Sequence, residues 1–233
     1  MVLLDPIGQD LDRLQTPHRK KRNRAVTVVV DIITVVFFSI CVFAFVNFPS
    51  LVLIGTYLVT PEEVQYNFPS AKETQSQAVA VVDVAPAKVP GVKQYPDNTV
   101  FIPKIGVQAP IGWDTTSGQV ADALEKNVVH LDGTSKPGGY GNIFITGHSS
   151  NYWWKEGDYN TVFALLPQLV EGDEIIVTYK GEFHHYKVTG SEEMKSSEVS
   201  KHLESDKEKL TIMTCTPVGT NLRRLLVYAD PIN

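Results

Sequence analysis

Residues 210–228 read Leu-Thr-Ile-Met-Thr-Cys-Thr-Pro-Val-Gly-Thr-Asn-Leu-Arg-Arg-Leu-Leu-Val-Tyr. Apolar and β-branched residues stand on both sides of a polar run with proline and glycine, which predicts two strands, 210–214 and 225–228, joined by a turn. A thiol therefore lies where the first strand ends, and two adjacent arginines lie where the second begins. Because side chains alternate across a strand, Arg223 and Arg224 cannot both face the same site.

The chain from 98 to 233 is predicted to form a single, mostly β domain. Short apolar or alternating segments are bounded there by Gly, Pro, Asn and Ser, which is typical of strands and turns. The other expected strands are 100–105, one beginning near 110, 128–131, 142–147, 174–179 and 183–188, and the expected helices are 117–124, capped by Ser117, and 161–169. Seven or eight short strands with few helices predict a closed or nearly closed β-barrel.

The N-terminal part of the chain has the pattern of a membrane anchor. A basic cluster at 18–24 precedes a long apolar stretch in which Asp31 is the only charged residue as far as Thr60. An apolar run of about 20 residues is long enough to span a bilayer as a helix. We predict a retained transmembrane signal-anchor helix at 25–48. Its outer end is either residue 48 or as far along the chain as residue 59. A cleaved signal peptide is the alternative, although no small-residue cleavage site is evident.

The positive charges set the expected orientation of this anchor. Because basic residues favour the cytoplasmic side, we predict a single-pass protein of the cell membrane. Residues 1–24 would form a cytoplasmic tail, and the chain after the helix would lie outside the cell. Residues 49–97, rich in Pro and polar residues, are predicted to form an extracytoplasmic linker, in which 78–84 is apolar enough for a short strand. Residues 61–233 carry 15 Lys and Arg against 22 Asp and Glu, a net charge near −7 without a basic stripe. Nucleic acid is therefore not an expected partner.

Three residue types in the β domain carry candidate chemistry. Cys215 has no expected disulfide partner, because Cys41 lies in the apolar N-terminal stretch. His148 follows the apolar segment 142–147, and the two arginines are the only ones among 15 basic residues of the exported part. A strand-end histidine or a small buried cysteine is commonly structural when taken alone. Together they fit acyl transfer, in which a thiolate needs a base, a leaving amine needs an acid, and an oxyanion needs donors.

The run from Thr214 to Leu225, and the stretch Thr-Gly-His-Ser at 146–149, resemble the two signatures of sortases, which are bacterial cysteine transpeptidases built on an eight-stranded β-barrel. The resemblance covers about residues 98–233 and keeps the order His, Cys, Arg. It implies that Cys215 is the nucleophile that forms a thioacyl intermediate, and that His148 is its acid and base partner. It also favours Arg224 as the third catalytic residue, because the arginine of the family directly precedes the last strand.

The same resemblance implies a substrate and partners. The substrate would be a secreted protein with a Leu-Pro-x-Thr-Gly-like sorting signal near its C-terminus, cleaved after Thr and passed to an amine on a peptidoglycan precursor or a pilin lysine. Some sortases bind calcium through acidic loop residues, but the sequence places no such site here and no other cofactor is expected. The Thr-Cys-Thr-Pro form is closer to pilin-polymerising or accessory groups than to the housekeeping type.

Four further residues are candidates for substrate binding. Thr214 and Thr216 flank the thiol, and Trp153 and Trp154 lie in an aromatic segment, 152–159, soon after the histidine. This segment is interpreted either as an aromatic wall of the substrate groove or as a loop that plugs the barrel edge.

Two other functions remain open on the sequence. One is a catalytically inactive, sortase-like barrel that serves as a surface-binding or scaffold protein. The presence of a cysteine, a histidine and an arginine in the family's order argues against it. The other is a peptidoglycan-crosslinking transpeptidase, whose compact His-Gly-x-x-Cys signature is missing here.

Overall fold

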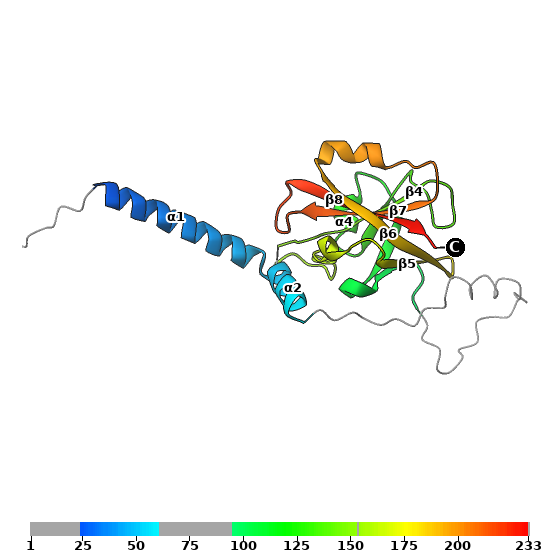
Figure 1. Ribbon diagram of the computed structural model, residues 1–233, viewed down its shortest axis with the longest axis horizontal. Helices are drawn as coiled ribbons and strands as arrows, with labels where there is room; N and C mark the ends of the chain where they lie inside the picture. Colours follow the sequence, from blue (N-terminus) through cyan, green and yellow to red (C-terminus); the bar gives the residue numbers. More distant parts are fainter. Residues whose placement is uncertain (1–23, 61–94, 153, 233) are drawn as a thin grey trace, which may run out of the picture. The chain divides into compact units, whose positions relative to one another are not determined.

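A computed structural model describes residues 24–60, 95–152 and 154–232. The chain divides into one compact unit up to Val42 and another from Phe43 onward. The helix α1 (Arg24–Val46), blue in Figure 1, precedes the other described elements in the chain. It has 23 residues and no buried side chain. Among the described residues it is the one helix that is both long and apolar enough to cross a membrane. The expected short strand at 78–84 lies outside the described residues.

Eight strands close a barrel in the order β1-β2-β3-β4-β7-β8-β6-β5 (Figure 1). Their bounds are β1 Thr99–Ile102, β2 Val107–Thr115, β3 Val128–Leu131, β4 Asn142–Thr146, β5 Glu174–Tyr179, β6 Glu182–Met194, β7 Lys209–Thr216 and β8 Arg223–Pro231. Strand β2 runs parallel to β3 and β4 runs parallel to β7, whereas the other neighbours are antiparallel. Closure pairs every strand on both sides, so the barrel has no exposed sheet edge. The predicted fold class is confirmed.

The helices of the barrel differ most from the prediction. They are α4 (Val120–Ala123) and three 3-10 helices, η1 (Pro103–Ile105), η2 (Leu166–Gln168) and η3 (Ser196–His202). The helix expected at 161–169 was wrong, because turns fill this region until η2, and Pro167 disfavours the α conformation of the residue before it. The strand expected at 100–105 ends before Pro103, and α4 begins after Gln119 without a cap from Ser117.

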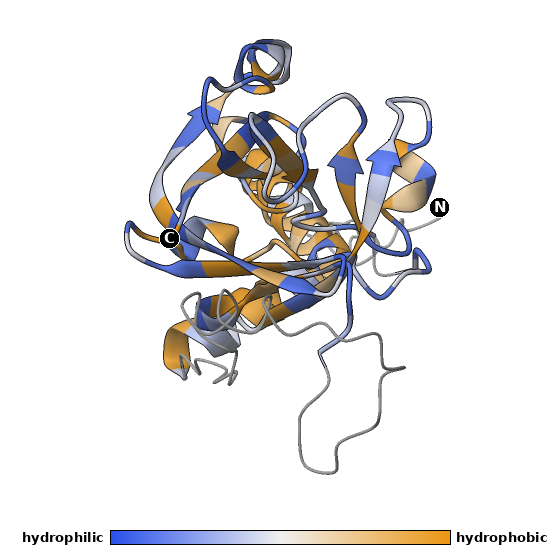
Figure 2. Ribbon diagram, turned by 90° about the vertical axis from the view of Figure 1, so that its right-hand side faces the viewer, coloured by the Kyte–Doolittle hydropathy of each residue, from blue (hydrophilic) through white to orange (hydrophobic). Residues whose placement is uncertain are grey.

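Figure 2 shows both apolar and polar residues along the strands of the barrel. Because side chains alternate along a strand, the apolar ones are sorted to its two faces. The interior of the barrel holds a cluster of 22 buried residues, from one face of the strands, among them Ile143, Leu210 and Val227, and from the connections, among them Phe163 and Leu166. The other face of β4, β6 and β8 carries a smaller cluster of Phe144, Met194 and Leu226. Parts of η3 and of β7 pack against this second cluster, so the sheet is apolar on both sides there.

The helix α2 (Phe48–Val59) follows α1 after the single residue Asn47. We expected this stretch to extend the membrane span or to belong to the linker. Instead, its partly buried Leu53, Ile54 and Tyr57 pack against the interior cluster of the barrel. The chain therefore reaches the barrel well before residue 95.

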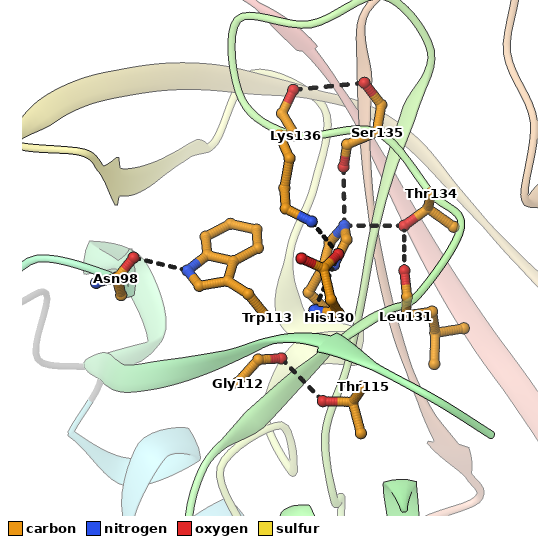
Figure 3. Close-up of polar contacts among 10 residues, drawn as sticks. Asn98, Gly112, Trp113, Thr115, His130, Leu131, Thr134, Ser135 and Lys136 are labelled. Carbon is orange, nitrogen blue, oxygen red and sulfur yellow. Dashed lines mark hydrogen bonds and ion pairs between the residues drawn. The ribbon is translucent and has the colours of Figure 1, made fainter. Parts of the chain in front are cut away.

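A buried histidine organises the connection between β3 and β4 (Figure 3). His130 is fully buried, and its Nε2 lies 2.8 Å from the carbonyl oxygen of Ser135, while its Nδ1 accepts the backbone N–H of Asp114 at 3.3 Å. Lys136 forms an ion pair with Asp114 and lies over the ring of Trp113. Burial lowers the pKa of His130, so its neutral form, with the proton on Nε2, satisfies both contacts.

Candidate active site

Cys215 lies near the end of β7, where its Cα is paired directly with that of Arg224 in β8. Residues directly opposite each other in an antiparallel pair point to the same face of a sheet. The half-buried thiol and the guanidinium-bearing side chain therefore share a face. Cys215 and Cys41 are both free cysteines, as the sequence predicts.

The face that carries this pair is also apolar. Met213 and Leu226, two residues away from Cys215 and Arg224, are paired with each other and belong to the second cluster. Because side chains alternate, all four point to the same side, opposite the barrel interior. The thiol thus lies at one end of an apolar strip.

His148 follows the strand β4, which runs parallel to the cysteine strand β7. Thr146 is paired with Met213, and the backbone N–H of Gly147 donates to the carbonyl oxygen of Met213 at 3.1 Å. His148 lies two residues beyond Thr146, and Cys215 lies two residues beyond Met213, so both residues lie toward the same end of this parallel pair of strands.

Two contacts fix the backbone that carries His148. Thr214 Oγ1 donates to the carbonyl oxygen of Gly147 at 2.9 Å, and the N–H of Phe163 donates to the carbonyl oxygen of His148 at 2.9 Å. A Cβ at position 147 would lie 2.5 Å from the ring of Phe163. Only glycine lets this ring approach the backbone, so Gly147 serves the placement of the histidine.

The surroundings of His148 favour its neutral form. Burial lowers the pKa of the imidazole, and the carboxylate of Glu125 partly opposes this effect. A neutral imidazole can accept the proton of a thiol and return it later to a leaving group. The electrostatics are therefore suited to a histidine that starts as a base.

The Glu125 carboxylate offers a test of this balance. In Glu125→Gln the charge that raises the pKa of His148 is removed, so we expect this pKa to fall further below its usual range. The measurement is an NMR titration of the Cε1 proton of His148. Glu171→Gln, which removes a carboxylate that does not act on His148, should leave the midpoint unchanged. A higher midpoint in Glu125→Gln would contradict the assignment.

Arg223 points away from the thiol. Its Nη2 donates to the carbonyl oxygen of Glu193 at 2.8 Å, and its Nε lies 3.6 Å from the carboxylate of the same residue. Arg223 is paired with Thr216, whose Oγ1 donates to Glu193 at 3.2 Å, so this group occupies the opposite face. Arg224 lies on the face of Cys215 and donates from Nη1 to the carbonyl oxygen of Arg223 at 3.0 Å.

The residues predicted to bind substrate lie in different places. Thr214 and Thr216 are buried and bonded to the protein framework as described above. Trp153 lies outside the described residues. Trp154 stacks on Tyr152 with ring centroids 4.8 Å apart, and the two side chains are 55% and 50% exposed.

Two features of the site were missed on the sequence. Cys215 Sγ donates to Asn221 Oδ1 at 3.6 Å, and Asn221 had only the signal of a turn residue. The N–H of Gly219 donates to Ser150 Oγ at 3.0 Å and so joins the segment after the cysteine to the segment after the histidine. Within the described parts of the chain, no group of three or more His, Cys, Asp or Glu side chains is placed to hold a metal ion.

Known proteins resemble this chain in sequence and in structure. The chain is 32% identical over 137 residues to sortase D of Bacillus subtilis and 25% identical over 134 residues to sortase A of Bacillus anthracis. Each match covers 56% of this chain, but only 61% and 57% of those relatives. Among solved structures, sortase C2 of pilus island 1 of group B Streptococcus superposes with a TM-score of 0.50 at 30% identity, covering 58% of this chain and 73% of that one.

A family model described as the sortase domain matches residues 100–232. This range runs from β1 to the end of β8 and includes Cys215, His148 and both arginines. The fold, the parallel pairing of the histidine and cysteine strands and this match lead to one conclusion, that the chain belongs to the sortase family.

Proposed function

We propose that this protein is a membrane-anchored cysteine transpeptidase that cleaves a sorting signal and transfers the acyl part to an amine. One observation carries the proposal, namely that Cys215 and Arg224 are direct cross-strand partners, while His148 follows the strand β4 that pairs with the cysteine strand β7. A thiol, a neutral imidazole and a guanidinium supply a nucleophile, a proton carrier and an anion binder.

The proposed reaction has two halves. His148 accepts the thiol proton of Cys215, and the thiolate attacks the scissile carbonyl carbon, whose oxygen becomes an oxyanion stabilised by Arg224. The C–N bond breaks when His148 gives the proton to the leaving amine, which leaves a thioester on Cys215. An acceptor amine then attacks the thioester, a new amide bond forms, and the thiol of Cys215 is restored.

Membership of the sortase family supports a sorting signal of the Leu-Pro-x-Thr-Gly type. Leu226, next to Arg224, is fully buried, but Met213, next to Cys215 on the same face, is only half-buried. Met213 therefore offers apolar surface that leucine or proline of a bound signal could cover. The threonine carbonyl would then come to the thiol of Cys215.

The anchor and the acceptor complete the proposal. With α1 as a retained span, residues 1–24 lie in the cytoplasm, and the sortase-like domain at 98–233 lies outside the cell membrane. The acceptor is an amine of a peptidoglycan precursor or of a pilin lysine. Likeness to a sortase of a pilus island supports the second of these.

The test uses the full chain, purified in detergent, with a library of sorting-signal peptides and added amines, read by mass spectrometry. We expect cleavage after Thr, an acyl adduct on the peptide that contains Cys215, and transfer products with the preferred amine. Pentaglycine, a short peptidoglycan peptide and a lysine-bearing pilin peptide separate the candidate acceptors. Absence of both adduct and cleavage across the library would overturn the proposal.

A further inference from the structure

We infer that the first turn of α2 is a positioning element of the active site, a role that rests on the proposed function. This turn contacts both segments that follow the catalytic residues. We call residues 147–150 the histidine loop and residues 217–222 the cysteine loop. The same turn begins one residue after α1 ends, so it also joins the site to the candidate membrane anchor.

The first contact is between α2 and the histidine loop. Ser50 is the one α2 residue that is buried, at 1% exposure, although the neighbouring Leu51 and Val52 are exposed. Its Oγ donates to the carbonyl oxygen of Ser149 at 3.3 Å. Ser149 directly follows His148, so this bond acts on the backbone next to the imidazole. A serine buried on an otherwise apolar helix is explained by this partner.

The second contact is between the start of α2 and the cysteine loop. Asn47 is 6% exposed, and its Nδ2 donates to the carbonyl oxygen of Phe43 at 3.0 Å, which fixes the amide in place. A Cβ added at Gly219 would lie 2.6 Å from Asn47 Oδ1. The loop backbone thus lies directly against this amide, in a left-handed conformation with φ of +84° that also favours glycine.

The two loops are also bonded to each other at the same place. Ser150 Oγ accepts the N–H of Gly219 at 3.0 Å, next to the residues that contact Ser50 and Asn47. Three segments distant in sequence therefore meet one residue from His148 and four residues from Cys215. Loops are the more mobile parts of a fold, and a misplacement of about 1 Å can cost an enzyme about two orders of magnitude in rate.

The body of α2 keeps the helix on the barrel independently of these polar contacts. Leu53, Ile54 and Tyr57 pack against the interior cluster, so removing one hydroxyl from the first turn should not release the helix. The first turn of α2 contacts the loops of the site, whereas the body of α2 holds the helix on the barrel. Substitutions in the first turn should therefore alter the rate of catalysis more than the stability of the fold.

The first test compares Ser50→Ala with Thr56→Ala in the full chain in detergent. Thr56 lies on the exposed side of the same helix, and its hydroxyl bonds only to carbonyls of α2. We expect Ser50→Ala to lower kcat about fivefold with KM within about twofold, the loss of one hydrogen bond that positions the loop. The rate of Cys215 alkylation by iodoacetamide, followed on its tryptic peptide, should change in parallel. Thr56→Ala should match the wild type, and the melting temperature should stay unchanged in both.

The second test uses Gly219→Ala together with Asn47→Ala. Gly219→Ala alone should lower kcat about tenfold or more, because the new methyl group meets the amide of Asn47 and the backbone is strained. Removing that amide should restore part of the loss, whereas the backbone strain stays the same in both backgrounds. The non-additive part of this double-mutant cycle isolates the contact.

The outcomes separate this inference from the proposed function. If Ser50→Ala leaves both kcat and the alkylation rate unchanged, or lowers only the melting temperature, the positioning role is overturned while the transpeptidase stands. Additive effects of Gly219→Ala and Asn47→Ala would also overturn it. If no peptide is cleaved but alkylation of Cys215 still responds to Ser50→Ala, the proposed function fails and the contact of α2 with the site is upheld.

Discussion

Replacing Cys215 by alanine is expected to abolish cleavage of a sorting-signal peptide, with kcat about four orders of magnitude lower or below detection. The reason is chemical, since no thioester forms without the thiol, and removal of a catalytic nucleophile has losses of this size or larger. The measurement is peptide cleavage by the full chain in detergent, together with a search for the acyl adduct by mass spectrometry.

The second cysteine supplies the matched control for this experiment. Cys41 lies in α1 and is exposed along the apolar helix, far in sequence from the barrel. Cys41→Ala should therefore keep full activity. Cleavage by Cys215→Ala at the rate of the wild type would refute the thiol mechanism, whatever the family of the chain.

Replacing Arg224 by alanine is expected to lower kcat/KM by about two to three orders of magnitude, as loss of an oxyanion donor does in other enzymes. Arg224 shares a face with Cys215, so its guanidinium can turn toward an oxyanion that forms there. Arg224→Lys keeps the charge but not the fork of donors, and should recover only a minor part of the loss.

Arg223→Ala is the control for this effect, since it removes the same side chain one residue away. Arg223 is held by Glu193 on the opposite face, and exposed ion pairs of this kind contribute little. Its kcat/KM should stay within about threefold of the wild type. Equal losses in Arg223→Ala and Arg224→Ala would sink the assignment of Arg224.

Much of the barrel could be predicted from local patterns. The strands expected at 128–131 and 174–179 have the bounds of β3 and β5, because β-branched residues follow one another there between clear turn signals. The helix at 161–169 was wrong, since its apolar residues serve the barrel interior from a series of turns, with Phe163 and Leu166 fully buried. Burial of these side chains against the barrel, together with the local effect of Pro167, decided the conformation there.

The active site could be predicted from the sequence only in part. Alternation showed that Arg223 and Arg224 face opposite sides, but only the register of β7 with β8 says which one lies beside Cys215. The contact of Ser50 with the histidine loop joins residues 99 positions apart, and a lone serine in an apolar helix gives no sign of it. Such contacts depend on where the folded barrel places its loops. The positions of the loops cannot be predicted from composition or periodicity.

The packing of α2 on the barrel has a consequence for reach. Asn47, one residue after α1, touches Gly219, and four residues of extended chain between Gly219 and Cys215 span at most about 14 Å. With α1 in the bilayer, as proposed, the thiol would lie close in the chain's path to the outer end of the membrane anchor, because Asn47 directly follows α1 and lies against the loop that carries Gly219.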